Sequence, residues 1–269
     1  MTVPTTTLVI TTYNNKEFLK LSLETVFEQT YLPDEIIIAD DGSREDTAEM
    51  IRGMTPQSPV PLIHVWQPDQ GFRAARSRNN AVAIASGEYL IFLDGDCYLN
   101  KYFIEDHLLF AQKNQFVVGT RVNIGTKRRE HIFRTGNHNI SFFSWGITKK
   151  LHAIRSHFLS RFRQKGGMAS ANFAAWRSDM ERVNGFNEFF EGLGWEDGEL
   201  ATRLVNAGVT LRKMVHLGMV YHFSHPQSAQ FNAEGLKSVH YSQSIDKEKI
   251  CCFKGLNRAR EEGVQILNK

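Results

Sequence analysis

The stretch Tyr89-Leu90-Ile91-Phe92-Leu93-Asp94-Gly95-Asp96 contributes most to the prediction of the fold. Its apolar part has the length of a buried strand, and it ends in two aspartates separated by one glycine. Residues at the carboxyl end of a strand in an open α/β sheet face the crevice where ligands bind. Two carboxylates there are costly unless a cation or a hydrogen-bonded partner compensates them. The pattern therefore predicts a divalent metal, Mg²⁺ or Mn²⁺, that holds a diphosphate.

The first hundred residues alternate between strand-like and helix-like patterns. Apolar segments of strand length are separated by segments with apolar residues at helical spacing. The predicted strands are residues 8–10, 35–39, 62–66 and 89–94, and the predicted helices are residues 16–29, 46–53 and 74–85. This alternation predicts an α/β fold with a mostly parallel sheet flanked by helices. Polar clusters follow the first, second and fourth strands, so we expect them to meet at one edge of the sheet.

The rest of the chain differs in character. Residues 121–165 contain eleven Lys or Arg residues, one acid and interleaved Phe and Trp residues. Residues 178–208 form an acidic, helical block, residues 211–221 are predicted as a strand, and the segment from 227 onward is predicted as helical. We therefore expect a main domain and a C-terminal helical extension, with these bounds: 1–226 (subdivided into 1–100, a basic aromatic insertion at 121–166, and 167–226) and 227–269.

The composition excludes several classes of protein. The chain of 269 residues has a net charge of +3, which favours no particular partner and gives no reason to expect nucleic acid. Its three cysteines are too few and too poorly spaced for a disulfide framework or a zinc site, and they fit a reducing compartment. We see no signal peptide and no apolar run near the ~20 residues that span a bilayer. These features predict a cytoplasmic protein that could at most lie on a membrane.

Two further motifs have both a structural and a functional interpretation. Asp40-Asp41-Gly42-Ser43 follows a predicted strand, and its residues are common in turns for purely structural reasons. The functional alternative is that one carboxylate accepts hydrogen bonds from a base or ribose. Gln70–Asn80 opens a helix with three arginines, which form either a solvated basic face or an anion site at the helix start.

Two motifs in the second half of the chain also have both a structural and a functional interpretation. His222 and His225 follow an apolar run and are either polar surface residues or metal ligands, the latter favouring Mn²⁺ over Mg²⁺. Residues 192–199 pack three acids behind an aromatic turn. The acids are favoured at a helix start by the macrodipole, but one of them could serve as a general base. Trp195 could stack on the apolar face of a sugar.

Taken together, the motifs resemble the inverting family 2 glycosyltransferases of GT-A fold over roughly residues 5–226. The second half is similar to chondroitin-polymerase and galactosyltransferase-type members. The motifs that carry the resemblance are Thr11-Thr12-Tyr13-Asn14, Asp40-Asp41-Gly42-Ser43, Arg78-Asn79, Gly87-Glu88-Tyr89, Asp94-Gly95-Asp96, Gly185-Phe186-Asn187-Glu188, Trp195-Glu196-Asp197 and Tyr221-His222.

The resemblance implies a nucleotide-sugar donor, with uridine as the base. Asp41 would bind the uracil ring, and Thr11 and Tyr13 would line the nucleotide pocket. Arg73 or Arg78 would help to hold the base or the diphosphate. In this interpretation residues 1–100 form the nucleotide-binding half and residues 167–226 the acceptor and catalytic half.

The resemblance also implies a metal site. Asp94 would contact the ribose or lie in the outer coordination sphere of the metal, and Asp96 would ligate Mn²⁺ or Mg²⁺. His222 would supply a further ligand, with His225 as the alternate. Two histidines in this loop leave that assignment open.

For catalysis, the resemblance implies that Asp197 is the general base and that Glu196 and Trp195 position the acceptor. The oxygen of the acceptor would attack the anomeric carbon from the face opposite the diphosphate, so that the configuration inverts.

The implied setting is cell-surface polysaccharide or lipopolysaccharide assembly, with a saccharide or lipid-linked acceptor. The basic aromatic segment would then lie on the anionic inner face of a membrane or cover the acceptor site, and the alternative is a solvated basic surface. Two other functions compete. A sugar nucleotidyltransferase usually has a glycine-rich loop after the first strand, which residues 11–16 lack. A binding module without turnover would need neither Asp96 nor Asp197.

Overall fold

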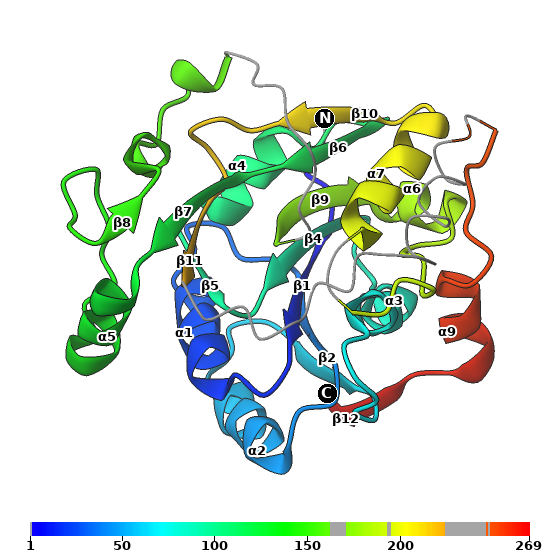
Figure 1. Cartoon of the computed structure of the whole chain (residues 1–269), viewed down its shortest axis with the longest axis horizontal. Helices are drawn as coiled ribbons and strands as arrows, with labels where there is room; N and C mark the ends of the chain where they lie inside the picture. The colour runs from blue at the N-terminus through cyan, green and yellow to red at the C-terminus, as the bar shows by residue number, and fades with distance from the viewer. Residues whose placement is uncertain (1, 162–170, 193–194, 224–245, 247) are drawn as a thin grey trace.

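The computed structural model describes residues 2–161, 171–192, 195–223, 246 and 248–269. Among these residues the largest element is an eight-stranded sheet in the order β10-β6-β9-β4-β1-β2-β3-β12, and a second sheet has the order β5-β11-β7-β8 (Figure 1). The strands of the large sheet are β1 (Thr6–Thr12), β2 (Glu35–Asp40), β3 (Leu62–Trp66), β4 (Tyr89–Asp94), β6 (Gln115–Val118), β9 (Asn172–Trp176), β10 (Thr210–Lys213) and β12 (Gln265–Asn268).

The first four strands pair in parallel, as predicted, and their order is β3-β2-β1-β4. The connecting helices are α1 (Lys16–Phe27), α2 (Glu45–Met54), followed by a 3-10 turn η1 (Thr55–Gln57), and α3 (Ala74–Ile84). Their bounds differ from the prediction by at most two residues. Because the strands are parallel, their carboxyl ends share one edge, and Thr11 lies opposite both Ala39 and Asp94. The polar clusters therefore meet as expected.

The later strands make the sheet mixed, because β9 runs antiparallel to both β4 and β6. The helices of this half are α4 (Phe103–Leu109), α6 (Arg177–Arg182) and α7 (Glu196–Asn206). The prediction of one strand over residues 211–221 is wrong. Its first part is β10 in the large sheet, and its last part belongs to β11 (Met219–Phe223) in the small sheet. The chain turns between them at Gly218, which has a φ of 53° and donates its N–H to Asp106 Oδ2 at 2.9 Å.

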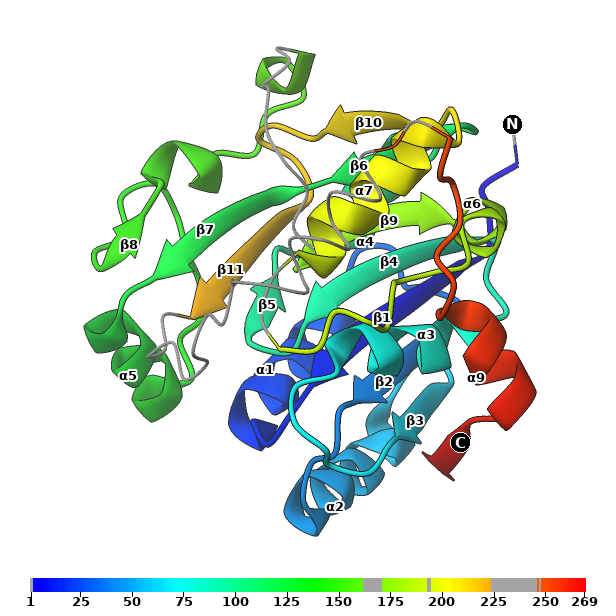
Figure 2. The ribbon, with the colours of Figure 1, turned by 45° about the vertical axis from the view of Figure 1, so that its right-hand side comes forward.

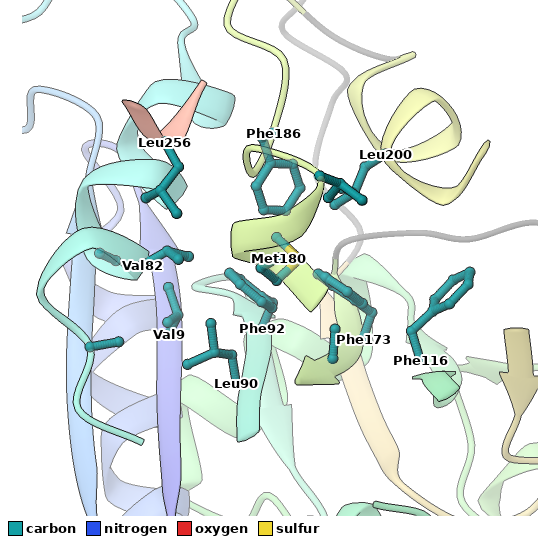
Figure 3. Packing of buried hydrophobic residues seen from close by; sticks show 14 of the residues in the cluster. Val9, Val82, Leu90, Phe92, Phe116, Phe173, Met180, Phe186, Leu200 and Leu256 are labelled. Atoms are coloured by element: carbon teal, nitrogen blue, oxygen red, sulfur yellow. The ribbon is translucent and has the colours of Figure 1, made fainter. Parts of the chain in front are cut away.

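A buried core lies between the large sheet and helices α3, α7 and α9, the last of which spans Leu256–Glu262 (Figure 3). Phe92 stacks on Phe173 with ring centroids 4.6 Å apart, and Phe186 meets Phe92 edge-on at 5.5 Å. All three rings are fully buried. Because a buried aromatic side chain contributes ~1.5–3 kcal/mol, this cluster fixes the loop before α7 to the centre of the sheet.

The basic aromatic segment forms a separate end of the molecule (Figure 2). With β5 (Cys97–Leu99) and β11, the small sheet contains β7 (Thr120–Ile124) and β8 (Ile147–Thr148), flanked by α5 (Thr126–Thr135) and the short 3-10 turns η2 (Lys150–Ala153) and η3 (Leu159–Arg161). The part of this segment from 162 to 166 lies outside the described residues. None of the described helices is long and apolar enough to cross a bilayer.

The C-terminal segment returns to the nucleotide half of the sheet. The sequence predicts helical structure from residue 227 onward, but among the described residues of this tail only α9 (Leu256–Glu262) is a helix, and residues 248–255 form turns and bends. Helix α9 lies beside α3 in both views (Figures 1 and 2). The chain then adds β12, antiparallel to β3, a strand that the sequence pattern does not predict. The predicted helical character of residues 227–245 falls outside the described residues.

Candidate functional site

The two aspartates after β4 lie where β1 ends. Gly95 donates its N–H to the carbonyl oxygen of Thr11 at 2.7 Å, and a Cβ on Gly95 would lie 2.8 Å from that oxygen. A side chain between the aspartates would therefore push β1 and this turn apart. Glycine allows the close approach that places Asp94 and Asp96 at the carboxyl edge of the parallel strands.

Arg78 connects three segments of the chain at this edge of the sheet. Its Nη2 donates to Asp94 Oδ1 at 3.1 Å, its Nη1 to Glu196 Oε1 at 3.5 Å, and its Nε to Thr11 Oγ1 at 3.2 Å. The Arg78 side chain is only 4% exposed. The structure thus brings together four of the residues that the sequence singled out, from β1, α3, β4 and α7.

Carboxylates crowd around this guanidinium. Burial raises the pKa of Glu196 to about 7, the charge of Asp197 raises it as well, and Arg78 opposes both effects. Burial likewise raises the pKa of Asp94, with a further contribution from Asp96 that Arg78 opposes. Glu196 Oε2 is buried without a hydrogen-bond partner among the described residues. Such a cluster favours a bound cation or a proton donor.

Asp96 and His222 form a pair that fits a metal ion. The Oδ2 of Asp96 lies 3.3 Å from Nε2 of His222, which β11 places opposite Cys97. Neighbouring ligands of one ion at metal–ligand distances of ~2.1 Å are roughly 3 Å apart. Within the described ranges no group of three or more His, Cys, Asp and Glu is placed to hold a metal, so an ion bound by Asp96 and His222 would need ligands beyond these two. The alternate ligand, His225, lies outside the described residues.

Asp41 forms a second polar centre at the end of β2. Its carboxylate is 3% exposed and accepts hydrogen bonds from the backbone N–H of Arg73 at 2.7 Å and from Gln67 Nε2 at 2.6 Å. Burial raises the pKa of Asp41 to about 6, although both hydrogen bonds oppose the increase. The Arg73 guanidinium instead donates to the carbonyl oxygen of Pro68 at 2.6 Å. Arg73 therefore contacts Asp41 through its backbone.

The turn after β2 is packed against the loop after β3. Gly42 has a φ of 98°, and a Cβ there would lie 2.5 Å from Cα of Asp69. Tyr13, from the end of β1, donates its hydroxyl to Asp69 Oδ2 at 2.9 Å. The Tyr13 side chain is half exposed, so its ring is open to solvent beside Asp69.

The start of α7 is held in an unusual conformation. Trp195 is the N-cap residue and has a φ of 78°, which costs energy for any residue with a Cβ and is common at functional sites. Glu196 and Asp197 follow in the first turn of the helix. The next turn is anchored by the buried pair of Glu199 and Arg203, whose Nη2 lies 2.6 Å from Glu199 Oε2. This pair fixes the helix that presents Trp195 and Asp197.

The family model described as glycosyl transferase family 2 matches residues 7–177, which is more than half of the chain. The chain belongs to glycosyl transferase family 2. A second model, described as the N-terminal domain of galactosyltransferase, matches residues 149–226, where Trp195, Asp197 and His222 lie. The family resemblance predicted from the sequence motifs is confirmed.

The curated relatives are much longer proteins. The hyaluronan synthase of Pasteurella multocida is 26% identical over 90% of this chain, and the chondroitin synthase of Escherichia coli is 27% identical over 81%. This chain spans 27% and 34% of their respective lengths. The family 2 domain therefore corresponds to only a part of each relative.

Two solved structures resemble the fold. GalNAc-T7 with UDP, GalNAc and Mn²⁺ has a TM-score of 0.65 at 16% identity, over 91% of this chain and 48% of that one. The mannosyltransferase PcManGT of Pyrobaculum calidifontis, in complex with GDP-Man and Mn²⁺, has a TM-score of 0.56 at 18% identity, over 90% of this chain and 64% of that one. These likenesses confirm the predicted GT-A type of α/β fold, with a central sheet flanked by helices.

Several polar residues of this family 2 domain were missed from the sequence. Gln67 directly follows the third strand, so the rule that identified Asp41 and Asp94 also applies to it. Asn80 and Arg258 gave no such signal, because one lies within a helix and the other in a tail without an evident motif. Both are nevertheless buried, and hydrogen bonds through Gln67 connect them to Asp41.

Proposed function

We propose that this chain transfers a sugar from a nucleotide donor, a UDP-sugar, to a hydroxyl group of a saccharide or lipid-linked acceptor, with inversion at the anomeric carbon. The observation that carries the proposal is the convergence of Asp96 with His222, and of Arg78 with Asp94 and Glu196, at the carboxyl edge of a GT-A sheet. Asp41 lies at the end of a neighbouring strand of the same edge, where a base can bind.

Each donor-binding residue has a role that its contacts support. Asp41 can accept a hydrogen bond from the N3–H of uracil, beside the exposed ring of Tyr13. Arg78 holds Thr11 and Asp94 in place, so that Asp94 can accept from a ribose hydroxyl. Arg73 fixes Asp41 through its N–H.

Asp96 and His222 would hold the metal, and a mixed set of oxygen and nitrogen ligands favours Mn²⁺. When bound, the ion supplies charge neutralisation to the departing diphosphate. Burial and the neighbouring charge of Asp96 raise the pKa of Asp94. Negative charge is therefore costly next to this position, and a divalent cation would relieve that cost.

Asp197 would take the proton of the acceptor hydroxyl as its oxygen bonds to the anomeric carbon. The bond from that carbon to the diphosphate oxygen breaks at the same time, and the electron pair leaves with the diphosphate. Glu196 and the indole of Trp195 would orient the acceptor sugar, the indole through its apolar face. Attack opposite the leaving group converts an α-linked donor into a β-linked product.

Thermal unfolding with nucleotides and metal tests the donor and the metal together. UDP with Mn²⁺ at about 100 times its Kd should stabilise the protein by ~2.7 kcal/mol and raise the Tm by about 5 °C or more. EDTA should remove the metal-dependent part, and Asp96→Ala should lack it. Absence of any shift with millimolar UDP, GDP or their sugars would contradict the proposal. A binding module would show the shift without releasing UDP from a UDP-sugar, whereas this protein should release it.

We further infer that the acceptor belongs to surface polysaccharide or lipopolysaccharide assembly and that the small sheet lies on an anionic membrane. Phe143, Trp145 and Phe158 are 88%, 50% and 67% exposed, and Lys149 and Lys150, which lie between them in the sequence, are exposed as well. Exposed aromatic and basic side chains together bind anionic headgroups.

Vesicle co-sedimentation tests this membrane surface. The protein should bind vesicles with anionic lipid at low salt. Lys149→Glu with Lys150→Glu should reduce binding by about thirtyfold or more, since each of the two basic residues near the surface contributes ~1 kcal/mol. The matched control reverses two exposed charges elsewhere, Arg52→Glu and Arg260→Glu. Equal binding by the two double variants would refute a membrane role for this face.

A further inference from the structure

A buried chain of hydrogen bonds connects the C-terminal helix α9 to Asp41. Arg258 Nη2 donates to Asn80 Oδ1 at 2.7 Å, Asn80 Nδ2 donates to Gln67 Oε1 at 3.0 Å, and Gln67 Nε2 donates to Asp41 Oδ1 at 2.6 Å. None of these four residues is more than 6% exposed. Arg258 lies beyond the residues that either family model matches.

The direction of this chain is set by Arg258. A guanidinium has only donors, so Asn80 must present its oxygen to Arg258 and its NH₂ group to Gln67. Gln67 must then receive that NH₂ group with its oxygen, which turns its own NH₂ group toward Asp41. The same Nε2 lies 3.4 Å from the carbonyl oxygen of Arg73, a second acceptor. The Asn80 and Gln67 amides are therefore oriented so that an NH₂ group faces Asp41. The Asp41 carboxylate must then act as the hydrogen-bond acceptor.

Arg258 is held firmly enough to set this direction. Its Nε lies 2.9 Å from Glu188 Oε2 and its Nη2 lies 2.8 Å from Glu188 Oε1. Asn79 Nδ2 also donates to Glu188 Oε1, at 2.9 Å. A bidentate Arg–carboxylate pair has a fixed geometry, and α9 packs beside α3, which carries Asn79 and Asn80 (Figures 1 and 2).

We propose that Arg258 is a positioning residue that determines which base the donor pocket accepts. Because the relay from Arg258 keeps Asp41 as an acceptor, the pocket favours a base that presents an N–H to it, as uracil does at N3. Cytosine presents a lone pair at N3 and is disfavoured. This inference rests on the proposed role of Asp41 in donor binding. It gives the C-terminal segment a function in nucleotide selection.

The variant Asn80→Asp reverses the relay with almost no change in volume. The new carboxylate still pairs with Arg258, but it cannot donate to Gln67. The Gln67 amide must then rotate, which turns its oxygen toward the Asp41 carboxylate and the Arg73 carbonyl. We expect the Kd for UDP to rise by about tenfold or more, the equivalent of one hydrogen bond to a charged group. The Kd for CDP should change much less, so that the preference for UDP over CDP narrows.

The matched control is Arg260→Met on the same helix, whose side chain is 52% exposed and pairs with Glu181. It should leave both affinities unchanged. Arg258→Lys keeps a donor at the start of the relay and should retain the UDP preference, whereas Arg258→Met should lose it. If Asn80→Asp does not fold, the comparison of Arg258→Lys with Arg258→Met shows whether the donor at position 258 sets the preference for UDP.

Isothermal titration of UDP and CDP, first to the parental protein and then to the variants, gives the result. Three results would overturn the relay. They are a folded Asn80→Asp variant with parental affinities, an equal loss of affinity for UDP and for CDP in that variant, and a preference for UDP over CDP that persists in Arg258→Met. Absence of UDP binding by the parental protein would overturn the proposed function together with the relay, whereas parental binding with unchanged variants overturns the relay alone.

Discussion

Replacing Asp197 with Asn should lower kcat by roughly 10²–10⁴-fold, the range typical for loss of a general base. Asparagine has the same shape but cannot take the proton of the acceptor hydroxyl. The base and metal sites should be little affected, because Asp41 follows β2 and the Asp96–His222 pair lies beside β5 and in β11, whereas Asp197 is in α7. The Kd for UDP with Mn²⁺ should therefore stay within about threefold of the parental value.

The measurement is a steady-state assay of UDP release paired with UDP titration. Glu191→Gln serves as the control, because this acid is exposed in the loop before α7 and should retain parental kcat. Parental turnover in Asp197→Asn would mean that another group is the base, and Glu196, with its pKa near 7, would be the next residue to substitute. Loss of UDP binding would instead mean that Asp197 supports the donor site.

Local patterns were sufficient to predict the nucleotide half of the fold. The strands at residues 35–39, 62–66 and 89–94 are short apolar runs bounded by polar turns, and the helices between them have a clear apolar face. Parallel pairing then follows from the alternation alone, and it places Asp41 and Asp94 at one edge without further information.

The errors occur where tertiary contacts override the local pattern. Residues 211–221 are apolar enough for one strand, but Asp106 binds the Gly218 N–H and the chain passes from one sheet to the other. The short strand β12 is exposed along most of its length and has no marked alternation. Its position depends on β3, which is nearly two hundred residues away in the sequence.

The site was predictable where a residue follows a strand and unpredictable where its partners are remote. Asp96 and His222 were identified from their separate motifs, although their separation of 3.3 Å depends on the pairing of β5 with β11. Arg258 could not be identified in this way, because its contacts with Glu188 and Asn80 form only when α9 packs against α3. Reactive groups at strand ends can therefore be identified from the sequence, whereas the residues that orient them become evident only from the packing of remote elements.

Replacing Arg78 with Met should both destabilise the protein and abolish turnover. Methionine fills a similar volume but leaves Asp94 and the buried Glu196 without their cation. Loss of one partner of a buried ion pair costs about 3–5 kcal/mol, and the Asp94 side chain is 32% exposed, so we expect a value of about 3 kcal/mol. Turnover should be lost because Asp94 and Glu196 no longer have a fixed orientation.

The destabilisation should depend on pH in a defined direction. The pKa of Glu196 in the folded protein is already raised to about 7, and removal of Arg78 raises it further. A carboxyl group with a raised folded-state pKa binds its proton more tightly in the folded than in the unfolded chain. Stability therefore falls as the pH rises from the pKa of the unfolded chain to that of the folded protein. The deficit of Arg78→Met should therefore be larger at pH 8 than at pH 5.5.

Urea unfolding at both pH values tests this prediction, with Arg76→Met as the matched control on the same helix. Arg76 is 26% exposed and pairs with Glu262, which is 52% exposed, so its loss should cost at most about 1 kcal/mol at either pH. Similar losses of unfolding free energy in Arg78→Met and Arg76→Met would mean that packing of α3, rather than the charge of Arg78, stabilises this region. A deficit in stability that grows toward low pH would have the opposite sign and would contradict the assignment of Arg78 as the cation that lowers the pKa of Asp94 and of Glu196.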